Sequence, residues 1–180
     1  TYGVVYGKEN DYVVAVSLED GTIHKVNIDG EGPQVILEEN NYIYVITHDT
    51  GFSGHVVKID PDKMEMVASQ ELGGFLDAFT ISNDSIYVSS FFAGIADEDY
   101  SESDEKQRDR TILTRLDANS LLIEEQKEHS ILLNSRDLIK INGYLYSTDD
   151  SNEDATDFGK TITKISPDTL EIIDRIDIER

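Results

Sequence analysis

The chain has 180 residues, no cysteine, no tryptophan and a formal net charge of −22 at pH 7. The absence of cysteine excludes disulfides, thiolate zinc sites and cysteine nucleophiles. The acidic excess disfavours nucleic acid and anionic membrane surfaces as partners, and without a run of about 18 apolar residues the sequence predicts no membrane span.

Alternating apolar and polar residues predict short β-strands along the whole chain. A first strand begins at Thr1, and pairs of strands joined by tight turns follow at residues 11–28, 34–47, 55–70, 78–90, 111–126, 137–148 and 160–176. The turns are rich in Asn, Asp, Gly and Pro, which favour tight turns and tolerate positive φ. No segment carries the apolar stripe of a useful helix, so the sequence predicts an all-β fold.

The strand pairs form an internal repeat. Ser17, Asp60, Asp117 and Ser166 mark the same turn in four copies, spaced 43, 57 and 49 residues apart. Repeats of about 40–50 residues with four strands are typical of β-propeller blades. With the strands of a blade named a to d in chain order, the chain contains b-c-d once and a-b-c-d three times. We therefore predict a single domain, 1–180, with antiparallel blades at about 1–30, 33–72, 75–129 and 134–180.

The first predicted blade lacks its inner strand a, which leaves three interpretations open. The chain is a small, nearly closed four-bladed propeller, or it is part of a larger propeller of seven or eight blades, or two copies complete each other as a dimer through the open blade edge. We expect that the chain is part of a larger propeller.

Three segments give the repeat a resemblance to known proteins. They are 57–61 (VKIDP), 114–117 (TRLD) and 163–167 (TKISP). They are similar to the strand-and-turn signature VxxIDPxT of the YVTN-repeat and quinoprotein-dehydrogenase-like β-propellers. The resemblance covers nearly the whole chain and implies the fold. No YVTN tetrapeptide is present, and without tryptophan there is no tryptophan-docking motif, so no quinone site is carried over.

The predicted b–c loops are long and differ from one another, whereas the a–b and c–d turns are short. These loops, at 48–55, 93–110 and 148–160, emerge on the same face as the d–a connections. Variable loops on a rigid scaffold commonly carry function, although long surface loops are also simply tolerated. We expect a protein or small-molecule ligand on this b–c loop face.

Candidate ligand-binding residues lie on the predicted channel face. Glycines in a d–a connection allow close approach of the backbone to a ligand, an arginine can clamp a carboxylate, and two histidines bracket one b–c loop. These candidates are Gly73, Gly74, Asp77, Arg136, Asp137, His48 and His55. Each also has a plain structural interpretation, as a tight bend, an ion pair or a polar loop network. His24 and His129 are strand residues with no evident partner.

Two acidic clusters are candidate metal sites. Asp97 and Asp99 begin a run of alternating oxygen-bearing residues, and Asp149 and Asp150 begin a second cluster. Hard cations prefer such oxygen ligands, which makes calcium a candidate. The run lacks the glycine and the closing glutamate of a calcium loop, and a solvated acidic loop is the alternative interpretation. The sequence predicts no other cofactor.

No catalytic triad, nucleophile elbow or phosphate-binding glycine loop is present. We therefore predict a non-enzymatic ligand- or protein-binding propeller module in the bacterial cell envelope or outside the cell; the composition is also compatible with the cytoplasm. The alternative is a metal-dependent hydrolase or lyase with its site at the channel mouth. A quinone-dependent oxidoreductase is a third hypothesis, against which the missing tryptophan argues.

Overall fold

The computed structural model describes residues 2–5, 12–47, 53–92, 110–129, 138–149 and 161–177, without the side chains of 2–5, Asp77 and Asp149. This part of the chain contains strands and turns and no helix. The strands are β1 (Tyr2–Val5), β2 (Tyr12–Val16), β3 (Ile23–Asn27), β4 (Pro33–Glu39), β5 (Tyr42–Thr47), β6 (His55–Asp60), β7 (Glu65–Glu71), β8 (Phe75–Ser82), β9 (Ser85–Phe92), β10 (Arg110–Asp117), β11 (Ile123–His129), β12 (Ile139–Ile141), β13 (Tyr144–Asp149), β14 (Thr161–Ile165) and β15 (Ile172–Asp177).

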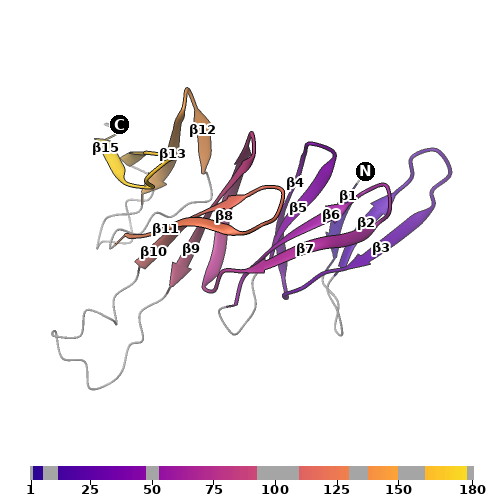
Figure 1. The fold of residues 1–180 in the computed structure, drawn as a ribbon. Coiled ribbons are helices and arrows are strands. Elements are labelled where there is room, and N and C mark those ends of the chain that lie inside the picture. Colours follow the sequence, from indigo (N-terminus) through magenta and orange to yellow (C-terminus); the bar gives the residue numbers. More distant parts are fainter. Residues whose placement is uncertain are drawn as a thin grey trace, which may run out of the picture. The chain divides into compact units, whose positions relative to one another are not determined.

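The described strands form four antiparallel sheets in which neighbours in sequence pair with each other (Figure 1). Sheet 1 contains β1–β3, sheet 2 β4–β7, sheet 3 β8–β11 and sheet 4 β12–β15. The predicted order, one b-c-d set followed by three a-b-c-d sets, is confirmed. Closure of a ring and the total number of blades stay predictions.

The chain divides into two compact units, which are described separately below. Unit 1 comprises residues 1–76 together with the turn at 119–122, and unit 2 comprises residues 77–118 and 123–180. Sheets 1 and 2 therefore belong to unit 1. Sheet 4 and nearly all of sheet 3 belong to unit 2.

The short a–b turns form where the sequence supplies residues that tolerate a left-handed backbone. Asn40 and Asn41 have φ of 50° and 62°, and Asn83 has φ of 57°. Asn142 and Gly143 follow the same pattern, with φ of 50° and 82°. The predicted positive φ values are confirmed at these positions, and they fix the hairpin register at each a–b turn.

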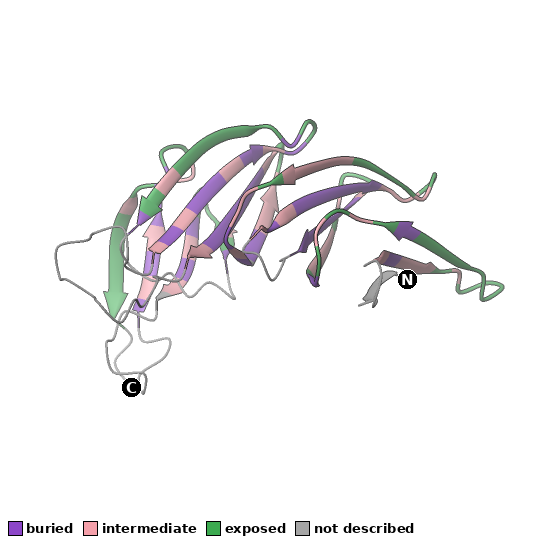
Figure 2. Ribbon diagram, turned by 90° about the horizontal axis from the view of Figure 1, so that it is seen from below, coloured by how far each residue is buried: buried purple, intermediate pink, exposed green. Residues whose placement is uncertain are grey.

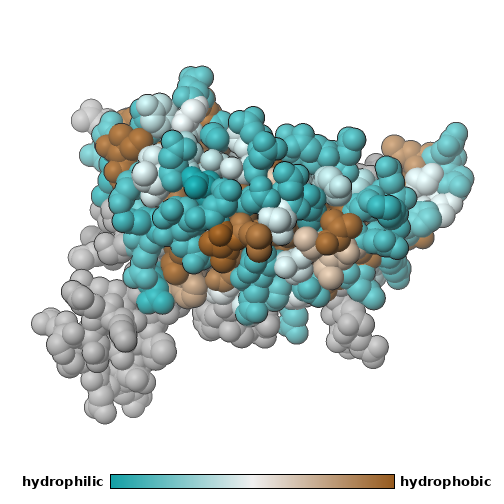
Figure 3. Space-filling view, in the orientation of Figure 1, coloured by the Kyte–Doolittle hydropathy of each residue, from teal (hydrophilic) through white to brown (hydrophobic). Residues whose placement is uncertain are grey.

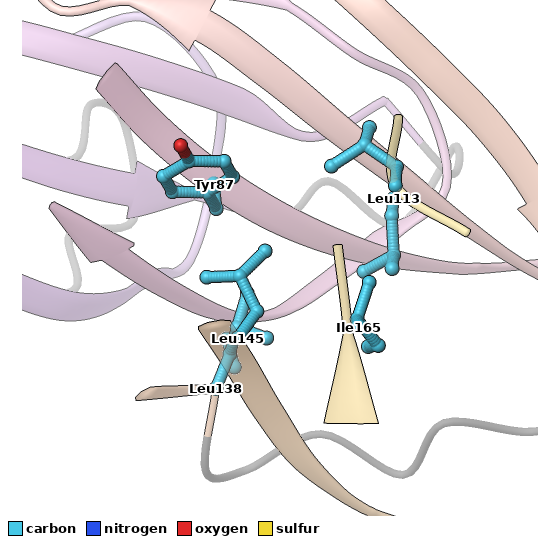
Figure 4. Packing of buried hydrophobic residues seen from close by; sticks show 7 residues of the cluster. Tyr87, Leu113, Leu138, Leu145 and Ile165 are labelled. Atoms are coloured by element: carbon cyan, nitrogen blue, oxygen red, sulfur yellow. The ribbon is translucent and has the colours of Figure 1, made fainter. Parts of the chain in front are cut away.

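In sheets 2 to 4 the buried residues lie mainly in the b and c strands, and the d strands are largely exposed. Five consecutive residues are buried in β5 and in β9, whereas β7, β11 and β15 are mostly exposed (Figure 2). Unit 1 has a core of Val13, Val26, Ile43, Val45, Val57 and Ile59. Unit 2 has a core of Ala78, Tyr87, Leu113, Leu138, Leu145, Ile165 and Leu170, and Figure 4 shows these side chains converging. Strand β5 is buried over nearly its whole length, which explains its nearly continuous apolar run.

Each c–d turn places one residue in the left-handed region, four positions after the marker Ser or Asp. This residue is Gly21 in sheet 1, Met64 in sheet 2, Leu121 in sheet 3 and Leu170 in sheet 4, with φ of 73°, 53°, 60° and 56°. Leu121 and Leu170 are buried, and Met64 packs against the unit 1 core. In sheets 2 to 4 the left-handed backbone thus turns an apolar side chain inward, and we call Met64, Leu121 and Leu170 the turn plugs.

Candidate functional site

Buried hydroxyl groups gather where the b strands end and the c strands begin, at the b–c end of the sheets. They belong to Thr47 in sheet 2, to Ser89, Ser90 and Thr111 in sheet 3, and to Ser147 and Thr161 in sheet 4. Two more buried hydroxyls, of Thr114 and Thr163, lie in the middle of their strands. The other end of the same strands buries Ile43, Ile59, Ile86, Leu116, Leu145 and Ile165. Buried polar groups must find hydrogen-bond partners or cost stability, so this polar end is the first place to look for a ligand.

In sheet 2 the polar end is built around His55. The backbone N–H of His55 donates to Thr47 Oγ1 at 3.3 Å, and Thr47 Oγ1 donates to the Asp29 carbonyl at 3.4 Å. Gly30, with φ of 79°, packs so closely that a Cβ there would collide with Thr47 Oγ1 and lie 2.9 Å from His55 Nδ1. Among the described residues, no group hydrogen-bonds His55 Nδ1, which is buried. The residues around His55 are therefore closely packed, and His55 Nδ1 is a buried polar atom without a hydrogen bond among the described residues.

The Gly73–Gly74 connection lies against the segment that precedes His55. Gly73 and Gly74 have φ of 72° and 71°, and Gly74 bridges Ser53. The Leu72 N–H donates to the Gly54 carbonyl at 2.8 Å, and a Cβ on Gly54 would collide with the Leu76 side chain. These contacts give the two glycines a structural role, because they allow a tight d–a connection to pack on its neighbour.

In sheet 3 the polar end holds Ser90 and Arg110. Ser90 Oγ is buried and makes no hydrogen bond within the described part of the chain. The Arg110 guanidinium lies 5.1 Å from the Phe92 ring centroid, and its Nε is 3.6 Å from Glu128 Oε2 without hydrogen-bond geometry. Sequence reasoning missed Ser90, Arg110 and the buried hydroxyls, because Ser and Thr are ordinary strand residues whose burial depends on neighbouring sheets.

Most of the predicted site residues fall where the structure gives no side-chain description. His48, Asp97, Asp99, Arg136, Asp137 and Asp150 lie outside the described residues, and only the backbone of Asp77 in β8 and Asp149 in β13 is described. His55, Gly73 and Gly74 are the predicted residues that the description covers, all within unit 1. Among the described residues, no three His, Asp or Glu side chains lie close enough together to hold a metal ion.

The opposite, c–d end carries a repeated basic residue that the register pairs with a tyrosine. Lys58 lies opposite Tyr44, Arg115 opposite Tyr87 and Lys164 opposite Tyr146. The Lys58 side chain is only 4% exposed, and its ammonium lies 4.0 Å from the Tyr42 ring centroid. Lys164 packs in the same way on Tyr144, at 3.7 Å. Such cation–π contacts hold the charged end of the side chain over the ring face.

In sheets 2 and 3 this basic residue binds backbone carbonyls of a c–d turn that comes later in the chain. Lys58 Nζ donates to the Asn119 carbonyl at 3.2 Å within unit 1. Within unit 2, Arg115 Nη1 donates to the carbonyls of Pro167 and Asp168 at 3.0 and 2.8 Å, and its Nε pairs with Glu124 at 2.9 Å. The sequence showed the Lys or Arg at this position but not its acceptors, which are distant in sequence.

His129 makes a third contact with a c–d turn, although the sequence offered no partner for it. Its Nε2 lies 3.0 Å from the Leu170 carbonyl, as expected for an N–H that donates to this oxygen. Burial lowers the pKa of His129 below its ordinary value of 6.5, and the Leu170 hydrogen bond opposes this only in part. The folded state therefore favours the neutral ring.

We expect the free energy of unfolding to depend on pH through His129. Because its folded-state pKa is lowered, its contribution is complete above pH 6.5 and is lost as the pH falls through the folded-state pKa. Urea unfolding of the wild type and His129→Gln between pH 8 and pH 5 measures this. Glutamine keeps a donor without the ionisation, so the wild type should lose more stability than the variant as the pH falls. Equal losses would contradict the assignment.

The comparisons with known proteins bear on the fold. No protein-family model and no curated protein matches the sequence. Among solved structures, the chain is similar to hydrazine synthase of Kuenenia stuttgartiensis, with a TM-score of 0.70 at 10% identity. The match covers 98% of this chain and 59% of that one, so the chain spans less than two thirds of that structure's length.

A second match, to a chain of a mitotic checkpoint complex, has 11% identity and covers 98% of this chain and 60% of that one. Its TM-score of 0.37 carries no argument. The similarity to hydrazine synthase shows a propeller-like all-β fold and nothing about activity. In the described residues, no helix has the length and apolar character needed to cross a membrane.

Proposed function

We propose that the chain is part of a larger β-propeller of the YVTN-like kind and acts as a non-enzymatic module. It binds a protein or small-molecule ligand at the b–c end of its sheets. The observation that carries the proposal is that two buried polar atoms at this end, His55 Nδ1 and Ser90 Oγ, make no hydrogen bond within the described residues. Ser69 Oγ and Thr163 Oγ1, in the middle of their strands, share this property. A ligand that hydrogen-bonds either atom offsets the cost of burying it.

The chemistry at this end favours binding over catalysis. The described groups are hydroxyls, one imidazole and one guanidinium, which donate and accept hydrogen bonds to a polar ligand. No described group hydrogen-bonds His55 Nδ1 to orient the ring as a general base, and the hydroxyl of its neighbour Thr47 bonds backbone groups. This pattern matches a recognition surface with a few fixed polar groups.

Replacing Ser90 with alanine tests the cost of its hydroxyl. We expect Ser90→Ala to raise the free energy of unfolding by about 1 kcal/mol, because it removes a buried polar group that makes no hydrogen bond. Ser147→Ala is the matched control. Its hydroxyl is also buried but donates to the Thr148 carbonyl at 3.1 Å, so this variant should lose about 1 kcal/mol. Equal losses in urea unfolding would show that Ser90 has a structural partner.

The binding side of the proposal is tested by amide chemical-shift mapping on the ¹⁵N-labelled chain. Mixtures of polar fragments (sugars, amides, carboxylates and amino acids) are added, with and without calcium, zinc or a chelator. The proposal expects shifts at Thr47 and His55 for a ligand of sheet 2, or at Ser90 and Thr111 for a ligand of sheet 3. Shifts confined to other surfaces would overturn it. Hydrolysis of an added fragment that depends on a metal would support the enzymatic alternative instead.

A further inference from the structure

Sheet 1 departs from the repeat at the position of the basic residue. In sheets 2, 3 and 4 the residue opposite the b-strand tyrosine is Lys58, Arg115 or Lys164. In sheet 1 the register places Ala15 opposite Tyr2. The c–d turn then continues in the same way, because the Ser17 N–H bonds the Thr22 carbonyl as the Ser166 N–H bonds the Glu171 carbonyl. Sheet 1 therefore keeps the local fold but lacks the cation.

The carbonyls that a cation of sheet 1 would bind are those of the next c–d turn, in sheet 2. Pro61 and Asp62 follow the marker Asp60 as Pro167 and Asp168 follow Ser166, and the latter two accept hydrogen bonds from Arg115. The turn itself is formed, because Asp60 Oδ1 accepts the N–H groups of Asp62 and Lys63 at 3.0 and 3.1 Å. Among the described side chains, none donates to the carbonyl of Pro61 or Asp62.

A cavity lies where the missing side chain would be. It has a volume of about 390 Å³ and lies wholly within unit 1. Its lining residues come from β2, β3 and the c–d turns of sheets 1 and 2: Ala15, Val16, Ser17, Leu18, His24, Pro61, Asp62, Lys63 and Met64. The volume is within the usual range for small-ligand sites, about 300–1,000 Å³.

The walls of the cavity suit an alkyl chain that ends in a cation. Ala15, Val16, Leu18 and Met64 are apolar, and Leu18 is 84% exposed at the rim. Figure 3, in the same orientation as Figure 1, shows hydrophobic residues on the surface near the β2–β3 turn. The stems of lysine and arginine pack on such surfaces while their charged ends reach polar atoms.

The charges around the cavity also favour a cation. Lys63 is part of the lining, but its ammonium pairs with Asp60 at 2.7 Å. Hydrogen bonds from the Ser17 hydroxyl and from Thr22 lower the pKa of the nearby Asp20 to about 2, so this carboxylate stays ionised in mild acid. The net charge of −22 adds a field that attracts cations.

We propose that this cavity is a binding site for an alkylammonium or guanidinium group that bonds the carbonyls of the sheet 2 turn in place of the absent side chain. The lysine or arginine side chain of a protein partner and a free alkylamine share this chemistry. The site is at the c–d end of the sheets, away from the b–c end, and it stands independently of the function proposed above.

The direct test is an amide-shift titration of the labelled chain with three probes. One is a short capped peptide with a central lysine, the second is the same peptide with norleucine, and the third is 1,5-diaminopentane. The lysine peptide should shift the amides of residues 15–18 and 62–64, and the norleucine peptide should bind at least about tenfold more weakly, because it lacks the charged donor. Comparable affinity for the diamine identifies a free amine as the source, whereas a clear preference for the peptide identifies a protein partner.

Filling the site from within gives the second test. Ala15→Lys places the repeat's own side chain in the cavity and should abolish saturable binding while raising the melting temperature. Ala15→Met fills a similar volume without a charge and should also block binding, without that rise. Val67→Lys adds the same charge at an exposed position of β7 and should leave the affinity within about twofold. Equal binding of the two peptides, or unchanged binding by Ala15→Lys, would overturn the proposal.

Discussion

Truncating Leu170 to alanine should lower the free energy of unfolding by about 3 kcal/mol, as is usual for a fully buried leucine. Leu170 is the turn plug of sheet 4, and it is buried within the unit 2 core that includes Tyr87 and Leu113. Alanine removes these contacts and leaves a cavity between side chains of two sheets. Urea unfolding followed by circular dichroism measures the change.

A second substitution at the same position separates packing from backbone strain. Leu170 has φ of 56°, in the region that glycine adopts at little cost and alanine does not. Leu170→Gly should therefore be more stable than Leu170→Ala by about 1 kcal/mol, although in a strand or helix glycine is the less stable of the two. Leu122→Ala, at a position that is 65% exposed, is the control and should change stability by less than about 0.5 kcal/mol. The reverse order of the glycine and alanine variants would show that the turn relaxes out of the left-handed region.

Replacing Arg115 with alanine should lower the free energy of unfolding by about 2–3 kcal/mol. The guanidinium bonds two carbonyls of the sheet 4 turn and pairs with Glu124, and its loss leaves both carbonyls without this donor. Arg115→Lys should recover roughly half of the loss, because an ammonium bonds one carbonyl, as Lys58 bonds that of Asn119.

The measurement for Arg115 is equilibrium unfolding at low and moderate salt. A pair on a solvated surface would weaken with salt, whereas bonds to backbone carbonyls at a partly buried position should persist. Glu124→Gln removes only the carboxylate charge and should cost less than about 1 kcal/mol. If Glu124→Gln lowers the free energy of unfolding as much as Arg115→Ala does, the ion pair with Glu124 and not the bonds to the turn carbonyls is the main interaction of Arg115.

The strand order could be predicted from the sequence because its determinants are local. Apolar alternation and the Asn-rich a–b turns specify each hairpin within about ten residues, and the repeat supplies the phase. The marker position at Ser17, Asp60, Asp117 and Ser166 pointed to the c–d turns for the same reason. The turns recur in the structure with the expected geometry.

The candidate site could be predicted only in part, because its contacts link residues that are far apart in sequence. The acceptors of Lys58 and Arg115 are 61, 52 and 53 residues away. A leucine in a turn at positive φ also runs against local preference, so Leu121 and Leu170 could not be recognised as plugs from their own segments. The glycines at 73 and 74 were correctly placed in a tight d–a connection, whereas their use by a ligand stays a prediction.

The repeated contacts at the c–d turns have a direction. Lys58 and Arg115 bind carbonyls of the c–d turn of the following sheet, and Leu170 packs on core residues of the preceding sheet, sheet 3. Between sheets 1 and 2 the plug, Met64, is present, and the cation is replaced by Ala15. In repeat proteins, stability is approximately a sum of terms for each repeat and for each contact between neighbours, and the contact between sheets 1 and 2 lacks one of these two interactions. Local unfolding of sheet 1 should consequently cost less free energy than local unfolding of sheet 2. A ligand bound in the cavity should raise this cost again.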